Sequence, residues 1–90
     1  MADTPYKASD SWSETARYTA AEDVDVLLSA VLNSLTFSIT ADDVAPAFPA
    51  GHGHPVAAGA SLPMKLKAGE RLWIASSHGS AVALLGILTP

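Results

Sequence analysis

Apolar and polar residues alternate in residues 35–40, which is the pattern of a β-strand with one buried face, and short apolar segments that read as further strands follow in the second half of the chain. Turns rich in Gly, Pro, Ser and Asp separate these segments at the spacing of about 8–12 residues that small sandwiches show. The predicted strands are residues 35–40, 62–66, 71–76 and 81–89. Gly69 lies in the turn between the second and third of them, where a tight hairpin can require a positive φ. The pattern predicts a mainly β fold, a small β-sandwich or jelly-roll-like domain.

Two periodicities compete in residues 19–35. One helical face would be formed, at helical spacing, by Val24, Leu27, Leu28, Val31, Leu32 and Leu35. Thr19 and Glu22 have the form of a capping box, which also favours a helix. Val24, Val26 and Leu28, however, occupy every second position, as in a strand. Because the segments that follow have a β pattern, we expect at least residues 24–28 to be a strand. The alternative is an α+β fold with one helix at about residues 20–34.

The N-terminal segment and one internal stretch lack periodicity. Residues 1–13 are polar and turn-rich, which predicts an extended N-terminal arm, followed by a single β-rich domain of residues 14–90. Residues 12–19 alternate in part and predict a short strand. Residues 44–60 contain three Pro and three Gly and predict a long loop at the edge of the domain. The core is expected to contain Phe37, Ile39, Leu66, Leu72, Ile74, Val82 and Leu84.

The composition indicates that this domain needs a stabilising partner. The chain has 90 residues, of which 49% are hydrophobic and 16% are charged, whereas about 25% charged residues is typical of globular domains. A domain of this size buries only about 60–65% of its unfolded surface, and a chain with no Cys has no disulfide to compensate. A metal or a second subunit remains, and the shortage of charge favours a surface that another subunit covers.

The net charge of −4 is unevenly distributed. Up to Ala45, eight acidic and two basic residues give −6; from Pro46 onward, one acidic and three basic residues give +2. In a symmetric assembly, this asymmetry favours contact between opposite halves of neighbouring subunits. So few bases argue against nucleic-acid binding. The chain has no apolar run long enough for a membrane span and no apolar stretch after Lys7, so we expect neither a membrane segment nor a signal peptide, and a protein that is made and kept in a cytoplasm.

Histidines supply the candidate metal ligands. His52 and His54 are two residues apart and would need a third ligand, such as His78 or Asp43, because zinc sites generally use at least three protein groups. A His-X-His pair between Gly and Pro is typical of a loop tip, so we expect no metal and no other cofactor. Two serines precede His78, but no nucleophile elbow, phosphate-binding loop or paired carboxylate motif accompanies them. We therefore expect no enzymatic activity.

Large aromatic residues are the candidates for subunit contacts. Trp12 lies in a polar stretch and is suited to docking on a neighbour. Trp73 lies between Leu72 and Ile74 and is either a core residue or an interface anchor. The histidines of residues 52–54 are candidates for a pH-sensitive contact. The predicted interface residues are Trp12, Tyr18, Trp73, His52 and His54.

Several segments after Ala45 resemble the small virion proteins of tailed bacteriophages, in which an extended strand pair of the form lpi.l.aGe.l precedes an apolar strand, a Gly-containing turn and a closing strand. These segments are PAF (46–48), HPVAAG (54–59), SLPM (61–64), KAGERLWIA (67–75) and GSAVA (79–83), and the resemblance covers roughly half of the chain. It implies a compact β-sandwich used as a capsid decoration or cement protein, a head fibre or a tail-attached piece. Residues 19–35 depart from it, since such sandwiches need no helical period.

The resemblance implies a structural component of a phage particle, located in the virion, that binds copies of itself and a major capsid or tail protein. Repetition in a symmetric assembly would combine contacts that are weak singly. One alternative is a glycan- or receptor-binding module on the virion, in which Trp73 or residues 51–55 face the ligand. The other is a small cupin-like metal-binding protein that uses His52, His54 and His78.

Overall fold

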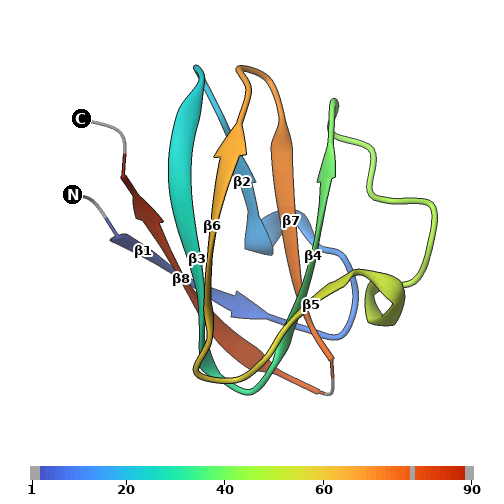
Figure 1. Cartoon of the computed structure of the whole chain (residues 1–90). Coiled ribbons are helices and arrows are strands. Elements are labelled where there is room, and N and C mark those ends of the chain that lie inside the picture. The colour runs from blue at the N-terminus through green and yellow to red at the C-terminus, as the bar shows by residue number, and fades with distance from the viewer. Residues whose placement is uncertain (1–2, 78, 89–90) are drawn as a thin grey trace.

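The chain folds into two antiparallel four-stranded sheets packed against each other (Figure 1). The computed structural model describes residues 3–77 and 79–88. Sheet A contains, in spatial order, β1 (Asp3–Ala8), β8 (Ala81–Ile87), β3 (Val24–Leu32) and β6 (Ser61–Leu66). Sheet B contains, in spatial order, β2 (Arg17–Thr19), β7 (Arg71–Ser76), β4 (Leu35–Thr40) and β5 (His54–Val56). Two short 3-10 helices, η1 (Glu14–Ala16) and η2 (Ala50–His52), lie in the connections.

The strand order is that of a jelly roll. β4 pairs with β5, β3 with β6, β2 with β7 and β1 with β8, so the chain runs as one long hairpin wound into two sheets. The predicted mainly β sandwich is therefore confirmed. Gly69 has the expected positive φ of 89°, but its turn joins β6 to β7 in the opposite sheet rather than closing a hairpin. The loop predicted at residues 44–60 contains η2 and β5.

The helical alternative for residues 20–34 is wrong, and the strand expected at residues 24–28 is longer than expected. β3 runs through nine residues between β8 and β6. Its buried, inward residues are Val24, Val26, Leu28 and Ala30. Pairing with two neighbouring strands and burial of alternate side chains outweigh the local helical preference, which amounts to only tenths of a kcal/mol per residue.

The prediction of a separate N-terminal arm at residues 1–13 is corrected by β1. This strand pairs with β8 along its whole length, from Asp3 opposite Gly86 to Ala8 opposite Ala81. Ala8 is 2% exposed, so β1 belongs to the sandwich, and the domain does not begin at residue 14. Met1 and Ala2 lie outside the described residues. The strand predicted at residues 12–19 is shorter, because η1 precedes β2.

The core lies between the two sheets, and four of the seven predicted core residues are buried in it. They are Phe37, Leu66, Leu72 and Ile74. Ile39 is 37% exposed because it lies near the end of β4. Val82 and Leu84 are only half-buried, since β8 turns Ala81, Ala83 and Leu85 inward instead. Nearly every residue of β8 is apolar, so its sequence contains no signal for which alternate set faces the core.

Candidate interaction surfaces

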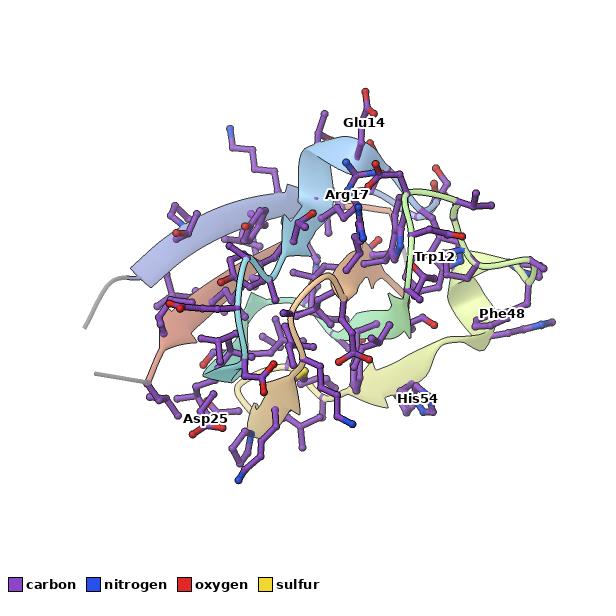
Figure 2. All side chains as sticks on the ribbon, turned by 90° about the horizontal axis from the view of Figure 1, so that it is seen from above. Trp12, Glu14, Arg17, Asp25, Phe48 and His54 are labelled. Carbon is purple, nitrogen blue, oxygen red and sulfur yellow. The ribbon has the colours of Figure 1, made fainter. Side chains whose placement is uncertain are left out.

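The outer face of sheet B is covered by the chain's own loop, residues 41–53 between β4 and β5 (Figure 1). Of this loop only Ala50 is buried. Trp12, from the connection between β1 and β2, holds the loop in place: its Nε1 donates a hydrogen bond of 2.9 Å to the Phe48 carbonyl oxygen. The Phe48 ring meets the Trp12 ring edge to face, with centroids 6.1 Å apart (Figure 2). Trp12 thus contacts its own chain.

Gly53 lets the loop approach sheet B closely beside Trp12. A Cβ atom at this position would lie 2.8 Å from Trp12 Cη2 and 3.0 Å from the Phe37 carbonyl oxygen. The same Cβ would lie 3.1 Å from the Cβ of Thr36, a buried residue on β4. The Thr36 hydroxyl has no hydrogen-bond partner among the described residues. A buried hydroxyl without a partner destabilises the fold modestly.

Two arginines fasten the start of the same loop to sheet B. Arg71 Nε donates to Asp43 Oδ1 over 2.9 Å, and Arg17 Nη1 lies 3.5 Å from the same oxygen. The Arg17 guanidinium also lies over the Trp73 ring, 5.1 Å from its centroid. Trp73 Nε1 in turn donates to Thr40 Oγ1 over 2.8 Å. Asp43 is the exposed member of this cluster, while both arginines are mostly buried, so the cluster joins strands and loop rather than presenting free charge.

These contacts show where the predicted aromatic interface residues lie within the single chain. Trp73 is 3% exposed, which contradicts its place at an interface, but it lies outside the cluster between the sheets: it pairs with Ser38 on the outer face of sheet B and is covered by its own chain. Tyr18 is half-buried against the core, and Trp12 is half-buried under its own loop. A role of these two residues between subunits stays a prediction, but each has a sufficient partner within its own chain.

The histidines do not converge where the structure describes them. His52 ends η2 and is exposed. His54 begins β5 and is also exposed (Figure 2), and its ring centroid lies 5.2 Å from that of Phe37. His78 lies outside the described residues. Among residues 3–77 and 79–88, no group of three His, Cys, Asp or Glu residues could hold a metal ion.

The outer face of sheet A was not among the predicted interaction surfaces. No segment among the described residues lies over it, in contrast to the loop over sheet B (Figure 1). Directly paired residues of antiparallel strands point to the same face, which identifies the outward set. Its apolar members are Pro5, Leu27, Val31, Leu32, Pro63, Val82 and Leu84. The continuous apolar sequence of β8 was the available signal, because a strand with one solvated face would alternate.

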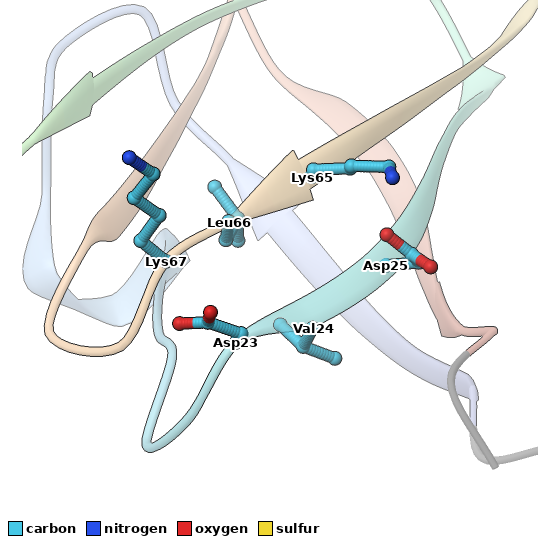
Figure 3. A pocket seen from close by; sticks show the side chains of 6 residues that line it. All are labelled: Asp23, Val24, Asp25, Lys65, Leu66 and Lys67. Atoms are coloured by element: carbon cyan, nitrogen blue, oxygen red, sulfur yellow. The ribbon is translucent and has the colours of Figure 1, made fainter.

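Two adjoining hollows lie at the end of sheet A where β3 begins and β6 ends. The first, about 290 Å³, has Val24 and Leu66 at its middle. Asp25 and Lys65 stand on one side of it and Asp23 and Lys67 on the other (Figure 3). Asp23 Oδ1 also accepts a 2.9 Å hydrogen bond from the Ala68 backbone. The second hollow, about 300 Å³, is more apolar and is lined by Asp25, Val26, Pro63, Met64, Lys65 and Leu88.

Within the described part of the chain, no helix has the length and apolar character required to cross a membrane. Comparison of the chain with protein-family models, with curated proteins and with solved structures finds no match.

Proposed function

We propose that this chain is a structural subunit of a bacteriophage particle, a decoration, cement or fibre protein that binds copies of itself and a major capsid or tail protein. The observation that carries the proposal is the uncovered apolar outer face of sheet A. Two further points support it: the resemblance of residues 46–83 to small phage virion proteins, and a jelly-roll fold of the kind that viral capsid proteins use. The last point is an analogy of fold alone.

The distribution of charge makes the face of sheet A suitable for a protein partner. Its outward charged side chains lie near its ends, with Lys7 at one end and Asp25 beside Lys65 at the other. The centre is formed by Leu27, Leu84 and neighbouring small residues. Such an arrangement, an apolar centre with a polar rim, is the usual anatomy of a protein interface. A face meant only for water would have charged residues at its centre.

The sheet edges are unsuited to assembly by strand addition. The edge strands of sheet A are β1 and β6, and those of sheet B are β2 and β5. Pro5, Pro63 and Pro55 lie in β1, β6 and β5, where each removes a backbone donor, and β2 has only three residues. Copies of the chain therefore associate through faces rather than edges.

The size of the face indicates contacts that are weak singly. Four strands at the usual spacing of about 4.8 Å make sheet A about 19 Å wide. The longest dimension of the molecule is 33 Å. The face therefore offers at most about 600 Å², below the roughly 800 Å² per partner of a standard interface. Repetition in a closed assembly raises the combined affinity, as in a particle with many identical sites.

Native mass spectrometry and light scattering test the self-association. We expect an oligomer whose population grows with protein concentration. Leu84→Lys, at the centre of the face, should raise the dissociation constant by about tenfold or more, because it buries an unpaired charge. Val44→Lys is the matched control, since Val44 is exposed on the loop over sheet B. A wild-type monomer at all concentrations would contradict the proposal.

Sedimentation tests the assignment to a particle. An antibody against the chain is expected to detect it in particles sedimented from an infected or induced source culture. Recovery only from the supernatant, with an oligomer seen in the purified protein, would retain self-association and reject the particle.

A further inference from the structure

The outer face of sheet A is raised at one end by a β-bulge. The pairing of β3 with β8 shifts register between Ala30 and Leu32, and Leu32 pairs with the outward residue Val82. The bulge turns Leu32 to the outer face. Without it, Leu32 would point inward, because it is even-numbered like the buried residues of β3. Val31 is 60% exposed and Leu32 57% exposed. Two adjacent large apolar residues thus project from this end, and with Val82 they form what we term the ridge.

The opposite end of the same face contains the more apolar of the two hollows. Pro63 and Leu88 contribute its apolar walls, and Asp25 and Lys65 stand at its margin. Leu88 is 44% exposed. Its backbone N–H donates a hydrogen bond to the Asp25 carbonyl oxygen, which places Leu88 beside the start of β3. A cavity of about 150 Å³ holds a benzene-sized group, so a hollow of about 300 Å³ has room for two aliphatic side chains.

The ridge and the hollow lie at opposite ends of β3. Val31 lies six positions after Asp25, and at about 3.3 Å per residue the two ends are about 20 Å apart. A face with a projection at one end and a recess at the other is complementary to a reversed copy of itself.

We infer that two copies of the chain pair through the outer faces of sheet A about a two-fold axis that reverses β3, so that each ridge enters the partner's hollow. This inference rests on the proposed self-association and specifies its geometry. The contact is reciprocal: each copy contributes one ridge and one hollow, so both contacts belong to a single kind of interface.

Shape distinguishes the reversed orientation from the alternative. Lys7 pairs with Val82 and therefore lies at the ridge end, whereas the hollow end holds Asp23 and Asp25 together with Lys65 and Lys67. The two-fold axis that reverses β3 brings each ridge over the partner's hollow. An axis parallel to the strands would instead place ridge on ridge.

Cross-linking tests this geometry directly, because the chain has no Cys of its own. Leu32→Cys combined with Leu88→Cys introduces one thiol on the ridge and one at the hollow. The two thiols of one chain are about 20 Å apart, too far for an internal disulfide. Under mild oxidation the double variant is expected to give a covalent dimer and nothing larger. A head-to-tail contact would instead give a ladder of trimers and tetramers.

Three controls make the outcome decisive. Leu32→Cys alone should give no covalent dimer, since the ridges lie at opposite ends of the pair; efficient dimer formation would overturn the reversed orientation. Val44→Cys with Leu88→Cys should also give none. Circular dichroism checks that each variant folds. A ladder, or no cross-link in a chain that still forms oligomers, overturns the pairing but leaves the proposed function; a monomeric wild-type chain overturns both.

Discussion

At the scale of single residues, Trp12 and Gly53 together determine how the β4–β5 loop lies on sheet B. Ala50 is the only residue of this loop that is itself buried, so the position of the loop depends on few contacts. Trp12 supplies a hydrogen bond and an aromatic contact to Phe48, and Gly53 leaves the space that the Trp12 ring occupies. A side chain at residue 53 would displace the indole and weaken both contacts.

Gly53→Ala is therefore expected to lower the free energy of unfolding by about 1–3 kcal/mol, the usual cost of overpacking. The φ of Gly53 is −72°, which alanine adopts freely, so the effect is steric rather than conformational. Gly51→Ala is the matched control, because a Cβ there meets nothing within 4 Å. Urea unfolding of the two variants measures the difference. Equal stabilities would show that Trp12 can move aside without loss.

Tyr6 makes the free energy of unfolding depend on pH in the alkaline range. Burial raises the pKa of the Tyr6 phenol above 10.0, and the neighbouring Tyr18 adds to the rise. The folded chain thus holds this proton more tightly than the unfolded chain. The resulting stabilisation is complete below pH 10.0 and is lost as the pH rises through the folded-state pKa.

Tyr6→Phe should consequently reduce the loss of stability above pH 10.0, because no phenol remains to ionise at this position. Urea unfolding at a series of pH values measures this slope. Below about pH 9 both proteins should show no tyrosine-dependent slope, which serves as the internal control. The same slope above pH 10 in both proteins would rule out Tyr6 as its source.

At the scale of elements, β1 is part of the sandwich despite its polar sequence. Tyr6 and Ala8 pack against the core, while Pro5 and Lys7 point outward. The strand was not evident from the sequence because Pro5 and the following polar residues suggest an irregular arm. Its structure is imposed by β8, which offers a complete row of partners from Ala81 to Gly86.

Ala8→Asp tests the role of β1, because it places a charge at a position that is 2% exposed. We expect a loss of about 3 kcal/mol or more, from burial of an unpaired carboxylate. Lys7→Asp, the neighbouring outward position, should change stability by about 0.5 kcal/mol or less. Thermal unfolding at low protein concentration compares them. If Ala8→Asp lowers the free energy of unfolding as little as Lys7→Asp does, β1 detaches freely from β8.

Predictability from the sequence differs among the elements for a physical reason. β4 and β7 were predicted with their observed bounds, because turn residues on both sides limit each run. The phase of β8 was not predictable, since its residues are apolar on both faces, and the error placed Val82 and Leu84 in the core. In β3, a local helical period and a strand period coexist, and only pairing with β6 and β8 selects the strand.

At the scale of the whole molecule, the two sheets have different outer faces. Sheet B is covered by residues of its own chain, so the predicted anchor Trp73 is buried. No described segment covers sheet A, and its edge strands contain prolines, so the proposed association uses its face. The candidate surface thus consists of residues that were predicted to lie in the core or were not singled out. Val82 and Leu84, two of the predicted core residues, belong to this surface instead.

The sequence by itself determined the fold class, the positions of most strands and turns, and the shortage of charge that favours a partner. These properties are local or additive, so they can be read from neighbouring residues and from composition. Only the tertiary structure decided which sheet face the loop covers, that Trp73 is buried, and that the bulge and the hollow share one face. Those properties depend on contacts between residues far apart in the chain, and alternation along a single strand contains no information about what lies across from it.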